Sequence, residues 1–82
     1  MAVATKPQVL WYPIRIAKER DAWGAYAIGV PVTAIDKTKT KAKQRVAEAL
    51  LFHLACCRQE GQSLPRPPKT HKATDYVAIG LL

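Results

Sequence analysis

The sequence predicts an α+β fold of order βββαβ, with one four-stranded mixed sheet and one long helix packed on one face. Three observations predict this: a period-2 alternation near the start, apolar segments interrupted by Gly and Pro, and a long Ala- and Leu-rich stretch without either. A chain of 82 residues buries only about 60–65% of its unfolded surface, which suffices for one sheet against one helix. Residues 1–82 are therefore expected to form a single domain.

The first strand is expected over residues 8–18. The apolar Tyr12, Ile14 and Ile16 alternate along the chain with a second set of residues, as in a strand with one buried face. This second set is Pro13, Arg15 and Ala17. Tyr12, Ile14 and Ile16 are the better core candidates, which leaves Trp11 for the outer face. Pro13 lacks an N–H and is expected near the start of the strand or at an unpaired position.

Two further strands follow a polar connection. Residues 22–30 read as the second strand, weakened by Gly24 and Gly29, and Pro31 interrupts it. Residues 32–35 supply a short third strand.

The helix is expected over residues 38–61. Thr38 or Thr40 can accept a hydrogen bond as the N-cap, and Gly61 is suited to a left-handed C-terminal position. One side of the helix carries a core-facing stripe of Ala42, Val46, Ala49, Leu50, His53 and Cys57. A second apolar row, on roughly the opposite side, consists of Ala47, Leu51 and Ala55. A helix with two apolar sides needs cover on both, and another chain can supply the second.

The last strand is expected over residues 75–82, after a proline-rich segment that excludes helix. Its apolar composition suggests cover on both faces. A right-handed crossover would place it parallel to the first strand, giving the sheet order 3-2-1-4.

In the order of these elements, the chain resembles the short members of the HicB antitoxin family. The resemblance covers about residues 10–82, and the order of its short motifs is the main evidence. They are Tyr12-Pro13-Ile14-Arg15-Ile16, Trp23-Gly24-Ala25-Tyr26-Ala27, Thr38 with Ala42, Ala49-Leu50 with His53-Leu54, and Glu60-Gly61-Gln62-Ser63-Leu64-Pro65-Arg66-Pro67. The chain departs from the family in lacking an acidic-Leu-Pro-Gly segment between strands two and three. Its helix also begins with lysines instead of glutamates.

The resemblance implies a truncated RNase H-like fold that binds without cleaving. It also implies a homodimer or tetramer and a small RNA-targeting, toxin-like protein as partner. From the residues themselves, the candidate oligomer or partner interface comprises Trp11, Trp23, Ala47, Leu51 and Ala55.

The alternative is a small nucleic-acid-binding protein. A net charge of +7 favours anionic partners. The candidate contacts are Lys37, Lys39, Lys41, Lys43 and Arg45, at the start of the helix and just before it. A solvated helix start explains the same run without a ligand.

No catalytic, metal or cofactor site is predicted, and we expect no enzyme activity. A nuclease of the RNase H type needs several converging carboxylates, whereas the acidic residues here are few and scattered. His53 is expected to be a half-buried core residue, and His71 has no paired nucleophile. The adjacent Cys56 and Cys57 are interpreted as small apolar residues. Residues 1–7 lack the pattern of a signal peptide and no run is long enough to span a membrane, so we expect a cytoplasmic protein.

Overall fold

The computed structural model describes residues 8–70 and 72–81. Three parts of the predictions lie outside this range. They are residues 1–7, which were used to predict localisation, His71, and Leu82 at the end of the last predicted strand. Within the described range the order is βββαβ, as predicted. The elements are β1 (Gln8–Lys18), β2 (Trp23–Ala27), β3 (Thr33–Asp36), α1 (Lys39–Gln59) and β4 (Asp75–Leu81).

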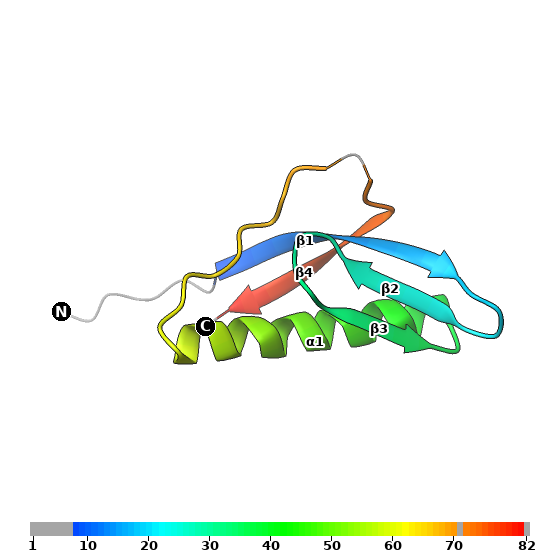
Figure 1. Ribbon diagram of the computed structural model, residues 1–82, viewed down its shortest axis with the longest axis horizontal. Coiled ribbons are helices and arrows are strands. Elements are labelled where there is room, and N and C mark those ends of the chain that lie inside the picture. Colours follow the sequence, from blue (N-terminus) through cyan, green and yellow to red (C-terminus); the bar gives the residue numbers. More distant parts are fainter. Residues whose placement is uncertain (1–7, 71, 82) are drawn as a thin grey trace.

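The four strands form one sheet in the order β3-β2-β1-β4, which confirms the predicted order, and α1 lies along one side of it (Figure 1). Every neighbouring pair of strands is antiparallel. The prediction that the last strand runs parallel to the first, in a mixed sheet, is therefore wrong.

The connection between α1 and β4 explains this direction. It covers residues 60–74 and passes on the side of β1 away from the helix before turning into β4 (Figure 1). At about 3.1 Å per residue, an extended proline-rich segment of this length spans roughly 45 Å, which exceeds the length of α1. The chain can thus return along the whole sheet and enter β4 from the opposite end.

Hydrogen bonds attach this connection to the sheet near its start and at its end. The Tyr12 hydroxyl donates a hydrogen bond to the Pro65 carbonyl (2.7 Å), and the Thr74 N–H donates to the Ile14 carbonyl (3.0 Å). Pro13 alternates with the core-facing residues of β1 and so belongs to the outer face, yet it is fully buried. The connection crosses on that side of β1.

The core lies between the helix and the facing side of the sheet. Tyr12 and Ile14 are fully buried, as predicted for the alternation of β1. From the helix, the fully buried side chains are Ala42, Val46, Leu50 and Leu54. Leu54 was not in the predicted stripe; it lies one turn beyond Leu50 and on the same side. His53 and Cys57 were in the predicted stripe, and both are half-buried.

The ends of the helix follow the predicted chemistry. The Thr38 hydroxyl accepts from the Lys41 N–H at 3.1 Å and serves as N-cap. Gly61 follows the C-cap with φ +73°, a left-handed conformation that glycine adopts at little cost.

The second strand is shorter than predicted. β2 ends at Ala27 because Gly29 adopts φ +83° and turns the chain. The Ala27 N–H donates to the Val32 carbonyl across this turn (2.9 Å), and β3 begins one residue later than expected, at Thr33.

Candidate protein-binding surface

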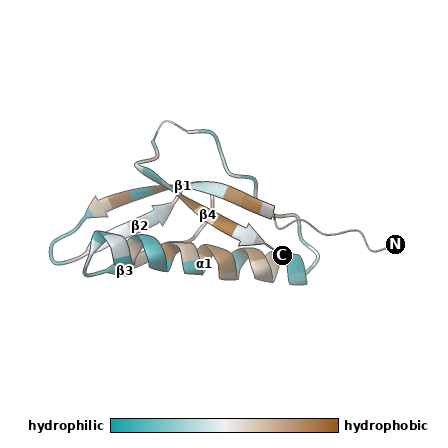
Figure 2. Ribbon diagram, turned by 180° about the vertical axis from the view of Figure 1, so that it is seen from behind, coloured by the Kyte–Doolittle hydropathy of each residue, from teal (hydrophilic) through white to brown (hydrophobic). Residues whose placement is uncertain are grey.

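The outer face of β1 and β4 is exposed and apolar. Trp11 is opposite Ala78, Val9 is opposite Gly80, and directly opposed residues of antiparallel strands share a face. Trp11 is 60% exposed and Tyr76 45% exposed, while Val9, Ala78 and Gly80 are exposed as well. Apolar colouring marks the centre of β4 and a short segment near the start of β1 (Figure 2). The surface formed by Val9, Trp11, Tyr76, Ala78 and Gly80 is called the outer patch below.

This arrangement corrects the prediction that the last strand is covered on both faces. Among residues 75–80, only Val77 and Ile79, which point toward the helix, are buried. The alternating size of side chains in β4 was the sequence signal, since large buried residues alternate with the small Ala78 and Gly80.

A groove of about 260 Å³ runs between α1 and β4. It is lined by Gln44, Ala47, Glu48, Leu51, Ala78, Ile79 and Gly80. Leu51 is 44% exposed there, although it is an aliphatic side chain in the middle of a helix. The groove and the outer patch share Ala78 and Gly80, so apolar surface continues around the edge of β4.

The predicted interface residues do not all lie together. Ala47 and Leu51 line the groove, and Ala55 is exposed one turn beyond Leu51 on the same side of the helix. Trp11 lies on the outer patch. Trp23 is separate: it is half-buried at the start of β2, on the side of the sheet that faces the helix.

Trp23 instead lies between two cations. The ammonium groups of Lys18 and Lys39 are each 5.9 Å from its ring centroid, within cation–π range. Because β1 separates β2 from β4, this aromatic cluster is not part of the surface around β4.

The basic residues at the helix start are largely occupied by neighbours within the chain. Lys43 forms a salt bridge with Asp75 at 2.7 Å, and Arg45 forms one with Asp36. With Lys39 placed over Trp23, only Lys37 and Lys41 of the predicted set are exposed with no salt bridge or cation–π contact.

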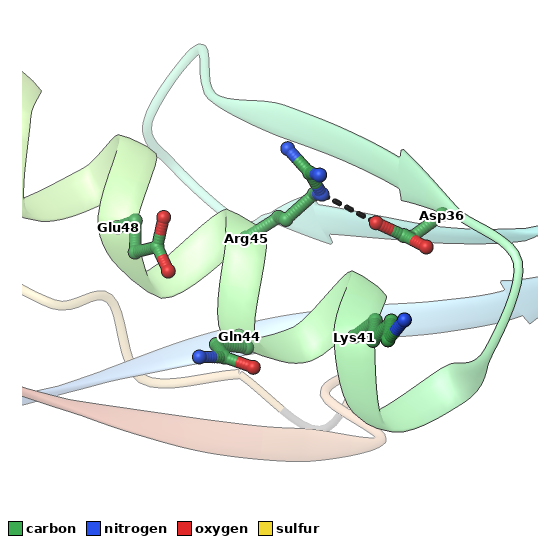
Figure 3. Close-up of a pocket in the computed structure, with 5 residues that line it drawn as sticks. All are labelled: Asp36, Lys41, Gln44, Arg45 and Glu48. Atoms are coloured by element: carbon green, nitrogen blue, oxygen red, sulfur yellow. Dashed lines mark hydrogen bonds and ion pairs between the residues drawn. The ribbon is translucent and has the colours of Figure 1, made fainter.

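The Arg45–Asp36 pair borders a polar hollow of about 290 Å³ (Figure 3). Lys41, Gln44 and Glu48 complete its lining. A hydrogen bond from the Lys37 backbone N–H has the largest lowering effect on the pKa of Asp36, and one from the Arg45 side chain has the next largest. The carboxylate is thus stabilised in its charged form by its own neighbours.

The carboxylate of Asp75 is held in the same way at the start of β4. The pKa of Asp75 is lowered mainly by a hydrogen bond from the Lys43 side chain, and to a smaller extent by one from the Tyr76 backbone N–H. Asp36 and Asp75 lie at the far edges of the sheet, on β3 and β4. Among residues 8–70 and 72–81, no three His, Cys, Asp or Glu side chains gather closely enough to hold a metal ion.

Within the same part of the chain, no helix combines the length and apolar character needed to cross a membrane. Comparisons of the chain with protein-family models, curated protein sequences and solved structures found no match.

Proposed function

We propose that this chain is a non-catalytic, HicB-like antitoxin, or an orphan relative, that binds and masks a small RNA-targeting protein in the cytoplasm. The observation that carries the proposal is the outer patch. It presents an exposed tryptophan and tyrosine on a rigid sheet, and large aromatic side chains dominate the energetics of protein interfaces.

The acidic residues support a binding role. Three of the six carboxylates have partners within the chain: Asp36 with Arg45, Asp75 with Lys43, and Glu19 as acceptor from a tyrosine hydroxyl. Their positions at separate edges of the fold do not suit two-metal chemistry, which needs several carboxylates at one point.

The charge distribution makes the proposed contact apolar. The five residues of the outer patch carry no charge, although the chain as a whole has a net charge of +7. A partner that is itself basic can therefore be bound through the patch without placing a cation directly against another cation in its centre.

The proposal is tested by co-expressing the chain with the small protein encoded beside it. We expect the pair to co-purify, the neighbour to cleave RNA when alone, and the chain to inhibit that cleavage. Trp11→Asp should abolish inhibition while the protein stays folded, because Trp11 is mostly exposed.

Phe52→Asp is the matched control. Phe52 is 72% exposed on the helix and lies outside both the outer patch and the groove, so this variant should inhibit like the wild type. A chain that neither binds its neighbour nor inhibits RNA cleavage contradicts the proposal, and so does equal loss in both variants.

The nucleic-acid alternative has narrower support, in the exposed Lys37 and Lys41 and the overall positive charge. Phosphate contacts predict an affinity that falls steeply with salt. Measurable RNA or DNA binding at low salt, weakened by Lys37→Ala with Lys41→Ala, would favour this alternative.

A further inference from the structure

β4 is an edge strand with an unprotected free edge. It pairs with β1 on one side only, because it ends the strand order. Proteins commonly protect such edges with charged side chains, prolines, bulges or very short strands. β4 has seven residues, and after Asp75 it contains neither a charge nor a proline.

The other edge of the sheet differs. β3 has only four residues, ends at Asp36, and is flanked by the Arg45 side chain from the helix. The two edges therefore offer a clear contrast, and β4 is the one suited to receive another strand.

The direction of the hydrogen bonds along β1 shows which backbone groups of β4 point to the free edge. The Pro13 carbonyl accepts from Ile28 on the β2 side, and the Ile14 carbonyl accepts from Thr74 on the β4 side. Since successive residues of a strand point their N–H and C=O groups to opposite sides, Val77 and Ile79 bond to β1. The backbone groups of Tyr76, Ala78 and Gly80 point to the free edge. Only the Tyr76 N–H has a partner there, the Asp75 side chain at 2.8 Å.

We propose that the occupant of this edge is β4 of a second copy of the chain, giving a two-fold symmetric dimer with one continuous eight-stranded sheet. An isologous interface requires a surface that complements itself. In the antiparallel register that places Ala78 opposite Ala78 of the second copy, the N–H and C=O groups of the two alanines bond to each other.

The same register pairs a large side chain with a small one. Tyr76 of each copy then lies opposite Gly80 of the other, on the outer face. A Cβ built on Gly80 meets no atom within 4 Å, so there is open space above it, while Tyr76 is half-exposed in the single chain. An aromatic ring over a glycine of the neighbouring strand fills this space.

Charge and the groove favour the same occupant. No charged side chain lies between Tyr76 and the end of β4, so two copies approach along a neutral strand despite their positive net charge. Ala47 and Leu51 line the groove beneath this edge, and a strand added to β4 covers them. This accounts for the exposure of Leu51. The inference does not rest on the proposed function, although Tyr76, Ala78 and Gly80 belong to the outer patch as well.

The test is the oligomeric state of the full chain, measured by light scattering after size exclusion. We expect twice the 9.1 kDa of the single chain at micromolar concentration. Ala78→Lys should yield a monomer, because it places two lysines directly opposite each other. Ala78 is exposed, so the variant should retain the wild-type circular dichroism spectrum.

Ile35→Lys is the matched control on the other edge. Ile35 is an exposed apolar residue of β3, so this variant should remain dimeric. Hydrogen exchange provides a second readout: the Ala78 and Gly80 amides should be protected in the wild type and exchange at least about tenfold faster in Ala78→Lys.

A monomeric wild type overturns the proposal, as does a dimer that survives Ala78→Lys. A wild type that is monomeric alone, and whose Ala78 and Gly80 amides become protected from exchange only when its RNA-targeting partner is added, would assign the edge to that partner and would also overturn the dimer. Because Trp11→Asp tests the outer patch separately, failure of one proposal is distinguishable from failure of the other.

Discussion

The hydrogen bond between Tyr12 and Pro65 gives a quantitative test of how the connection is held on the sheet. Tyr12→Phe keeps the ring in the core and removes only the hydroxyl, which donates to the Pro65 carbonyl at 2.7 Å. A typical intramolecular hydrogen bond contributes about 0.5–1.5 kcal/mol net. The Pro65 residue is half-buried, so its carbonyl is only partly rehydrated after the change.

For a domain of this size, 1 kcal/mol corresponds to about 4–8 °C in Tm. We therefore expect Tyr12→Phe to lower Tm by roughly 2–12 °C in thermal unfolding followed by circular dichroism. Amides of residues 60–74 should also exchange faster, since this contact attaches the connection to β1. Burial, and to a lesser extent the neighbouring Cys57 thiol, raise the pKa of Tyr12, so its absorbance titration should be shifted to higher pH.

Tyr26→Phe is the control for this measurement. The Tyr26 hydroxyl donates to Glu19 in an exposed position, where water replaces the bond, so its loss should leave Tm almost unchanged. Equal Tm values for wild type and Tyr12→Phe, or an equal loss in the two variants, would show that the Tyr12–Pro65 hydrogen bond does not hold the connection on the sheet.

Three further predictions concern the core, a turn and pH. Leu54→Ala should cost about 2–5 kcal/mol in urea unfolding because Leu54 is fully buried, whereas the exposed Phe52→Ala should stay within about 0.5 kcal/mol. Gly29→Ala should destabilise by about 1–3 kcal/mol, because φ is +83° and the new Cβ would lie 2.8 Å from a proline of the connection. Asp75 has a lowered pKa in the folded state, caused first by Lys43. Its stabilising contribution is therefore present above its unfolded pKa of about 3.9 and lost as pH falls through the lowered value. Tm should fall less on acidification in Asp75→Asn than in the wild type.

Each of these has a contrary outcome. Similar losses for Leu54→Ala and Phe52→Ala would mean that the helix presents a different side to the sheet. A neutral Gly29→Ala would show that the turn can take another conformation, and an unchanged acid response in Asp75→Asn would show that the ion pair does not matter to stability.

Local chemistry in the sequence was sufficient for the elements and most of the core. The alternation around Tyr12 and Ile14 identified the buried face of β1 and left Trp11 outside, as observed. Thr38 and Gly61 delimited the helix because capping depends on a hydroxyl and on a left-handed residue at fixed positions. The order of β1, β2 and β3 followed from the short connections between them.

Only the tertiary structure decided the direction of β4 and the surface that results. Residues 60–74 form a connection long enough to enter the last strand from either end, so no local pattern distinguishes parallel from antiparallel pairing. The antiparallel register then places Ala78 beside Trp11 and sets Tyr76, Ala78 and Gly80 along the free edge. Likewise, the contacts of Lys43 with Asp75 and of Lys39 with Trp23 could not be predicted from local sequence, because the partners are distant along the chain.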